Sequence, residues 1–231
     1  MSANKTLLIC RCAGRRLLNR EALEPLLRQD GAIPVSDLCG AAAAKDPVLG
    51  QIAGADAPVV CACHPRAVRA LFAFAGFPLP QNTEFINLRI PSGGPSAESD
   101  TAWYPVLDED RCTNCGQCFE FCLFGVYEKD SAGKIRVVNP HSCKNNCPAC
   151  ARICPAAAII FPKVGEAPIN GAEISDEEAL KANIRINVDE ILGGDVYAAL
   201  NARKQKRRSL LDQKKVEQAL AERKKCSEDK A

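Results

Sequence analysis

Short apolar runs recur along the first part of the chain and alternate with amphipathic stretches. Residues 5–10 (KTLLIC) and 57–63 (APVVCAC) are strongly apolar, which predicts two buried strands, and residues 32–39 (AIPVSDLC) predict a third strand with its loop. Residues 19–29 and 64–77 have their apolar positions at helical spacing. Strands that alternate with helices predict a small parallel α/β domain.

Composition divides the rest of the chain. The α/β domain is expected to span residues 1–90, and residues 91–101, rich in Gly, Pro and Ser, predict a linker. Residues 102–163 hold eight cysteines and form a second predicted domain. Residues 164–231 are polar and end in a basic tail, which predicts a helical extension suited to partner docking.

The cysteine content sets this chain apart from an ordinary globular protein. Of 231 residues, 47 % are apolar and 25 % are charged, both common values, but fourteen are cysteine. The first residues contain no secretory signal, and no stretch of about 18 apolar residues predicts a spanning helix. We therefore expect a cytoplasmic protein, in which dense reduced thiols indicate metal or redox chemistry and not a disulfide framework.

Eight cysteines form an internal repeat. The first run is CTNCGQCFEFC, the second is CKNNCPACARIC, and an apolar segment follows each. The last three cysteines recur at an offset of 32 residues, and the first recurs at 31 because the second run has one extra residue. Between the runs, residues 129–139 predict a hairpin. The eight residues are Cys112, Cys115, Cys118, Cys122, Cys143, Cys147, Cys150 and Cys154.

This spacing favours iron–sulfur clusters over zinc. A 4Fe–4S cube needs one thiolate on each of four irons, so three closely spaced cysteines can bind three corners and a distant cysteine the fourth. Zinc sites usually join two separated cysteine pairs. Here Cys115 would belong to two overlapping CxxC units, which does not suit zinc.

The two runs resemble a bacterial ferredoxin with two 4Fe–4S clusters, which implies an α+β ferredoxin-like fold with crossed ligands. Leu123 departs from the family's usual proline but removes no ligand. The gap before Cys147 is one residue too long, so Cys143 is the least secure ligand and His141 is a conceivable substitute. One cluster would take Cys112, Cys115, Cys118 and Cys154, and the other Cys122, Cys143, Cys147 and Cys150.

Five more cysteines follow the strands predicted in the first domain. Sites in a parallel sheet gather at the carboxyl ends of strands, so these cysteines are expected near one edge. The segments LLICRCAG and VVCACHPRAV, with an isolated LC between them, resemble the N-terminal domain of the flavin-bearing subunit of heterodisulfide reductase. The resemblance implies a third 4Fe–4S cluster, with Cys61 spare, on Cys10, Cys12, Cys39 and Cys63.

Two alternatives stay open for this third site. Cys61 could replace Cys63, Cys10 or Cys12 as a ligand, since all four stand near strand ends. The cysteines could also be buried only because small thiols pack well. Two CxC pairs in one small domain favour the cluster.

No catalytic motif accompanies the cysteines. The chain has no GxGxxG turn, no P-loop, no GxSxG elbow and only two histidines, so we expect neither a flavin nor catalytic residues. We expect an electron-transfer subunit that relays single electrons between a redox donor and the catalytic subunit of a multi-subunit oxidoreductase complex. The alternative is a structural or redox-sensing iron–sulfur protein whose basic tail binds a macromolecule.

The C-terminal tail differs in charge from the rest of the chain. Residues 196–231 hold eleven Lys and Arg against five Asp and Glu, with a ragged stripe of six aliphatic residues. Residues 175–178 predict a capping box, and residues 193–195 predict a break before a last helix that starts near residue 196. The single cysteine of the tail, Cys226, is interpreted as an incidental thiol.

Three roles compete for this last helix. It could be a solvated helix, a docking arm for a partner protein, or a nucleic-acid contact, which the lack of aromatics in the basic run disfavours. Folding back on the chain ranks below partner docking, because exposed ion pairs contribute only about 0–1 kcal/mol each.

Overall fold

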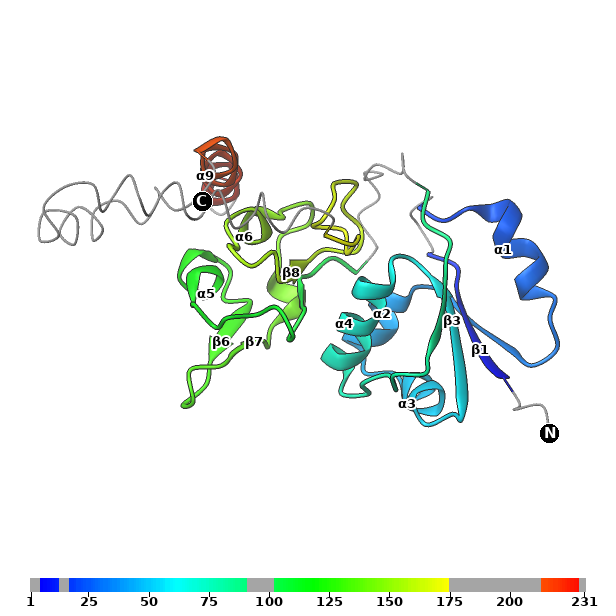
Figure 1. Ribbon diagram of the computed structural model, residues 1–231. Helices are drawn as coiled ribbons and strands as arrows, with labels where there is room; N and C mark the ends of the chain where they lie inside the picture. Colours follow the sequence, from blue (N-terminus) through cyan, green and yellow to red (C-terminus); the bar gives the residue numbers. More distant parts are fainter. Residues whose placement is uncertain (1–4, 13–16, 91–101, 175–212, 229–231) are drawn as a thin grey trace, which may run out of the picture.

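The protein has two lobes, with a C-terminal helix on the second lobe (Figure 1). The predicted linker, the capping box, the break after it and the start of the last helix near residue 196 all lie outside the described residues. The computed structural model describes residues 5–12, 17–90, 102–174 and 213–228.

The first lobe is built on a four-stranded parallel sheet in the order β2-β1-β3-β4. The central strands β1 and β3 are buried, with Leu8, Ile9 and Val60 at most 1 % exposed, as in parallel sheets covered on both faces. The parallel layer predicted from the sequence is confirmed, and β4 is an additional strand. The strands are β1 (Lys5–Cys10), β2 (Ala32–Val35), β3 (Ala57–Ala62) and β4 (Glu84–Asn87).

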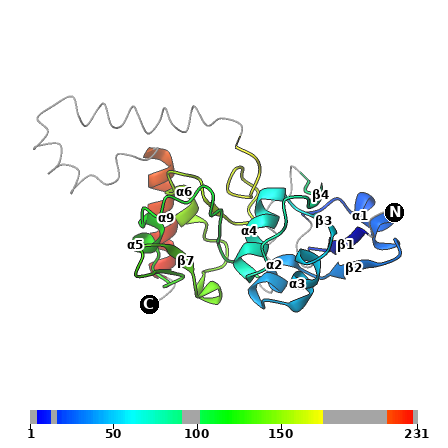
Figure 2. The same cartoon turned by 60° about the horizontal axis from the view of Figure 1, so that its bottom comes forward.

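Helices cover both faces of this sheet. Helix α1 lies on one face, and α2, α3 and α4 lie on the other, as right-handed crossovers require (Figures 1 and 2). Both predicted helices are confirmed with shorter bounds, whereas α2 and α3 were not predicted, because their segment is Ala- and Gly-rich without a clear apolar stripe. The helices are α1 (Arg20–Leu27), α2 (Leu38–Ala43), α3 (Pro47–Ala53) and α4 (Pro65–Ala75).

The second lobe consists of two similar halves. In each half a cysteine run leads into a short helix, α5 or α6, and then into a strand. The strands pair antiparallel as β5 with β8 and β6 with β7, and the second pair is the hairpin predicted between the runs. The elements are β5 (Val106–Leu107), α5 (Gln117–Phe121), β6 (Tyr127–Lys129), β7 (Ile135–Val137), the 3₁₀ turn η1 (Pro140–Ser142), α6 (Ala149–Arg152) and β8 (Ile159–Ile160).

The repeat extends to the backbone conformation. Asn114 and Asn146 each precede the second cysteine of a run, with φ of +54° and +60°. Gly125 and Ala157 each follow the last cysteine by three residues, with φ of +64° and +47°. Left-handed residues are uncommon outside glycine, so two such pairs at the same offset show that both runs trace the same loop.

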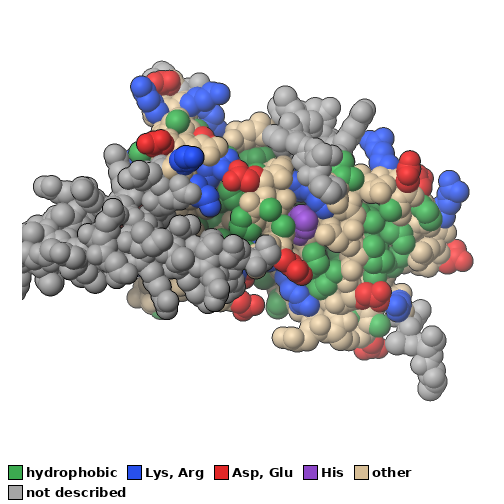
Figure 3. Space-filling view, turned by 45° about the horizontal axis from the view of Figure 1, so that its top comes forward, with side chains coloured by type: hydrophobic (Ala, Val, Ile, Leu, Met, Phe, Trp, Pro, Cys, Tyr) green, Lys and Arg blue, Asp and Glu red, His purple; other side chains and the backbone are tan. Residues whose placement is uncertain are grey.

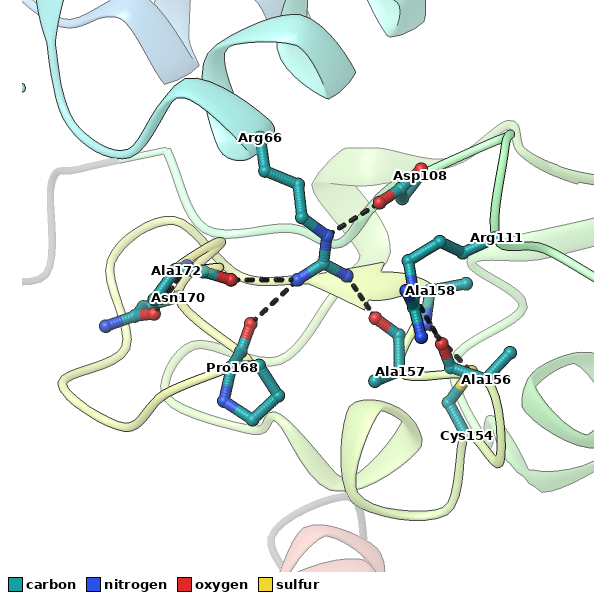
Figure 4. Close-up of polar contacts among 10 residues, drawn as sticks. All are labelled: Arg66, Asp108, Arg111, Cys154, Ala156, Ala157, Ala158, Pro168, Asn170 and Ala172. Atoms are coloured by element: carbon teal, nitrogen blue, oxygen red, sulfur yellow. Dashed lines mark hydrogen bonds and ion pairs between the residues drawn. The ribbon is translucent and has the colours of Figure 1, made fainter. Parts of the chain in front are cut away.

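Arg66 of α4 joins the two lobes (Figure 4). Its Nε lies 2.6 Å from Asp108 Oδ2, and both side chains are mostly buried. Nearby, a Cβ on Gly171 would lie 2.5 Å from the Cβ of Ala67, so the loop of the second lobe can approach α4 only with glycine there. The guanidinium of Arg66 also donates to the carbonyl oxygens of Ala157, Pro168 and Ala172.

Helix α9 (Gln213–Glu228) packs on α6 in both ribbon views (Figures 1 and 2). Ala219 is fully buried against Ala149 and Ile153. Arg152 Nε lies 3.0 Å from Glu222 Oε1, and these side chains are only 8 % and 24 % exposed. Residues 213–228 therefore fold back onto the second lobe, although folding back was expected to be less favourable than docking to a partner. The ion pair is largely buried and apolar contacts accompany it, so it contributes more than an exposed pair would.

No helix of the described ranges is long and apolar enough to cross a bilayer.

Candidate metal centres

Four cysteines from both runs surround one hollow of the second lobe, which is partly open to solvent. Cys118 interacts with the other three thiols, and the backbone N–H of Ala158 donates to Cys154 Sγ at 3.3 Å. Cys118 is buried, whereas Cys115 is exposed. We call this set the first ring, and its members are Cys112, Cys115, Cys118 and Cys154.

A second hollow lies beneath α9. Cys150 is buried and interacts with the other three ring thiols, and Tyr127 Oη donates to Cys150 Sγ at 3.1 Å. His141, the conceivable substitute ligand, is exposed and lines a different hollow. We call this set the second ring, and its members are Cys122, Cys143, Cys147 and Cys150.

The third set of cysteines lies at the carboxyl edge of the sheet. Cys10 ends β1 and interacts with Cys12 and Cys63, and Cys39 interacts with Cys10 and Cys63. The backbone N–H groups of Cys12 and Leu38 donate to Cys10 Sγ at 3.3 and 3.4 Å. We call Cys10, Cys12, Cys39 and Cys63 the third ring.

Cys61 differs from the four thiols of the third ring. It lies inside β3, fully buried, and its thiol interacts with the carboxylate of Glu84 on β4. Cys39 lies in the first turn of α2, in a segment that was expected to be a strand and its loop. The structure thus brings together the four residues expected for a third cluster and places Cys61 apart.

Positive charge converges on the third ring. The guanidinium of Arg89 interacts with Cys12, Cys39 and Cys63, and it also donates to two carbonyl oxygens of the second lobe. Lys163, with only 3 % of its side chain exposed, lies 2.6 Å from Asp37, two residues before Cys39. Buried thiolates need such compensating charge. Neither cation was predicted from the sequence, since no local pattern marks them and only the tertiary fold brings them to the ring.

Burial dominates the acid–base properties of these thiols. Loss of water raises the pKa of Cys63 to about 11 and the pKa values of Cys118 and Cys147 to about 12, and neighbouring thiols contribute in the same direction. The free thiols are therefore protonated at neutral pH, and binding of metal must release their protons. Burial likewise raises the pKa values of Cys10, Cys39, Cys143, Cys150 and Cys154.

The geometry of the rings suits a cluster better than a single ion. Among the described residues, no three Cys, His, Asp or Glu side chains converge closely enough to share one metal ion. Thiolates on one zinc ion would lie about 4 Å apart, because each Zn–S bond is about 2.3 Å long. A four-iron cube holds each thiolate on a different iron, so four cysteines that line one hollow, as in the first and second rings, can bind it without converging on a single point.

Comparison with known proteins agrees with this geometry in the second lobe. Residues 104–160 match the family described as 4Fe-4S dicluster domain. An uncharacterized ferredoxin of Methanocaldococcus jannaschii is 48 % identical over 64 residues, which are 27 % of this chain and 43 % of that protein. The pyruvate synthase subunit PorD of the same organism is 34 % identical over 52 residues, which are 20 % of this chain and 60 % of that subunit.

These matches show that residues 104–160 are a ferredoxin-type 4Fe–4S domain and that the chain is a ferredoxin-like iron–sulfur protein. This chain spans less than two thirds of the length of either relative. No solved structure matches it. The resemblance of the first lobe to the flavin-bearing subunit of heterodisulfide reductase stays a prediction.

Proposed function

We propose that this protein is an electron-transfer subunit of a multi-subunit oxidoreductase complex, and that a partner protein carries out the catalysis. The observation that carries the proposal is the pair of crossed cysteine rings in a dicluster domain packed against a third ring. The first and second rings would each hold one 4Fe–4S cluster and the third ring a further one. Such clusters exchange single electrons, with potentials set by charge, hydrogen bonds and exposure.

Arg66 connects the segments that carry the third and the first ring, and we call its contacts with the second lobe the Arg66 clamp. Cys63 of the third ring precedes Arg66 by three residues, and Ala157 follows Cys154 of the first ring by three residues. A single hydrogen bond from Arg66 to the carbonyl oxygen of Ala157 joins these segments (Figure 4). This contact supports electron transfer between the third and the first cluster, because it holds both ligand loops against each other.

The first ring also offers a route to a partner protein. Cys115 is exposed, and Phe119, next to Cys118 on α5, is a large apolar side chain that is 43 % exposed. The face seen in Figure 3 mixes acidic, basic and hydrophobic side chains over the described residues. A redox partner that covers Phe119 would come close to the first cluster.

The similarity to PorD supports the assignment to a complex, since that protein is a subunit of pyruvate synthase. The alternative function, a structural or redox-sensing role with a macromolecule bound by the basic tail, predicts clusters that do not pass electrons onward. The exposed edge of the first ring favours the relay. We propose neither a flavin nor a catalytic residue in this chain.

Metal content and redox titration test the proposal. Anaerobically prepared protein is expected to hold about twelve irons with as much acid-labile sulfide, and each cluster should accept one electron reversibly. Two neighbouring cysteines allow a test of the third ring alone. Cys63→Ala should lose about four irons, whereas Cys61→Ala should lose none.

The outcomes separate the parts of this proposal. Stoichiometric zinc with negligible sulfide would contradict the clusters altogether. About eight irons in the unaltered protein and in both alanine variants would remove only the third cluster. Clusters that load but exchange no electrons with small-molecule mediators would favour the structural alternative.

Tyr127 allows a test of the second cluster on its own. Its hydroxyl donates to Cys150 Sγ, and Tyr127→Phe removes this hydrogen bond while keeping the aromatic side chain. The midpoint potential of the second cluster is expected to fall by about 40 mV, since a bond of about 1 kcal/mol stabilises the more negative reduced state. In the control Tyr104→Phe, a buried hydroxyl that donates to the backbone oxygen of Cys39 is lost, and the second cluster should keep its potential. Equal potentials in the Tyr127 variant and the unaltered protein would contradict a cluster on Cys150.

A further inference from the structure

The hollow of the second ring is lined by one thiol more than a cube requires. Cys226 of α9 lines the same hollow as the four ring cysteines and is only 5 % exposed. It shares a side-chain hydrogen bond with Cys147 and interacts with Cys143. The fold therefore brings Cys226, which was interpreted from the sequence as an incidental thiol, to the second ring.

Several contacts hold α9 in this position. Glu222, one turn before Cys226, pairs with Arg152 of α6, and the guanidinium of Arg223 lies 5.3 Å above the ring of Phe121. Ala219, two turns before Cys226, is buried against α6. Residues at such helical spacing share one face, so the face of α9 that contacts α6 also presents Cys226 to the hollow.

Cys143 is the ring member that is separated from the rest of its run by an extra residue. The extra residue between Cys143 and Cys147 separates it from the other thiols of the loop, and the matching gap in the first run is shorter. Its Sγ lies 3.8 Å from the backbone oxygen of Lys144, and its side chain packs against the cores of both lobes. A four-iron cluster in this hollow could therefore bind Cys122, Cys147 and Cys150, with either Cys143 or Cys226 on its fourth iron.

We propose that Cys226 is a ligand-competent thiol of the second ring that can bind the cluster iron in place of Cys143. This inference rests on the proposed 4Fe–4S cluster of that ring. In the exchange, the bond from iron to Cys143 Sγ breaks, a bond to Cys226 Sγ forms, and one proton passes from the Cys226 thiol to the Cys143 thiolate. No electron is gained or lost. The exchange would fasten α9 to the cluster directly.

Alanine variants of the full chain test this exchange through iron and sulfide content and the spectrum of the reduced protein. Cys143→Ala and Cys226→Ala are each expected to keep the iron of the unaltered protein. The double variant should lose about four irons. Loss of this iron in Cys143→Ala alone would overturn the proposal, and so would full retention in the double variant.

A second pair of variants covers the case in which Cys143→Ala does not fold. Cys143→Ser keeps the size of the side chain, and a serine oxygen on iron would alter the spectrum. Ligation by Cys226 predicts a spectrum that matches four thiolate ligands, and an oxygen-ligated spectrum would overturn the proposal. Adding Glu222→Ala to Cys143→Ser should lower the iron content, while Glu222→Ala alone should not, because only the serine variant depends on α9. Failure of the proposed function would appear as missing iron in the unaltered protein, whereas failure of this inference appears only in the variants.

Discussion

Cys154→Ala is expected to remove about four irons from the protein and to abolish the signals of the first cluster. Cys154 belongs to the second run in the sequence, yet it lines the first hollow and its thiol interacts with Cys115. The remaining three thiols of the first ring leave one iron of the cube without a thiolate ligand. Iron analysis together with magnetic spectroscopy of the reduced protein measures the effect.

The reciprocal variant Cys122→Ala serves as the matched control. Cys122 stands in the first run but lines the second hollow, so its loss should affect only the second cluster. Local ligation within each run would produce the reverse result, with Cys154→Ala damaging the cluster held by Cys147 and Cys150. That outcome would contradict the crossed arrangement.

Arg66→Ala is expected to loosen the attachment between the lobes at a cost of about 3–5 kcal/mol in the free energy of unfolding. The substitution leaves Asp108 and three carbonyl oxygens without their donor, and the paired side chains are only 14 % and 13 % exposed. Hydrogen exchange of the iron-loaded protein should show faster exchange over residues 157–172, where the acceptors lie. Arg66→Lys should recover little of the loss, because an ammonium group cannot reach four acceptors in the planar geometry of a guanidinium.

Arg69 on the same helix provides the comparison. It is exposed and lies over the ring of Phe85 at 4.7 Å, so Arg69→Ala should cost no more than about 1 kcal/mol. Unchanged exchange over residues 157–172 in Arg66→Ala would show that the clamp does not hold the lobes together. Slower electron transfer from the third to the first cluster is expected in Arg66→Ala if the lobes separate.

Local patterns predicted most of the regular structure of the first lobe. The apolar runs of β1 and β3 are long and continuous, and the two amphipathic stretches that became α1 and α4 have clear helical spacing. Helices α2 and α3 have no such stripe, and β4 is only four residues long, so these elements depend on contacts with the rest of the lobe. In the second lobe, the cysteine spacing and the hairpin segment were enough to predict the repeat.

The sequence by itself determined which residue types could hold metal and how eight of them repeat, because loop ligation depends on short spacings along the chain. Only the tertiary structure decided three other features: the cations Arg89 and Lys163 beside the third ring, the Arg66 clamp, and the return of α9 to the second ring. Each depends on side chains far apart in the sequence, whose partners are chosen by burial and charge compensation once the lobes pack. For Cys226, a lone thiol in a basic tail became part of a cysteine ring because the helix face that carries it is buried against α6.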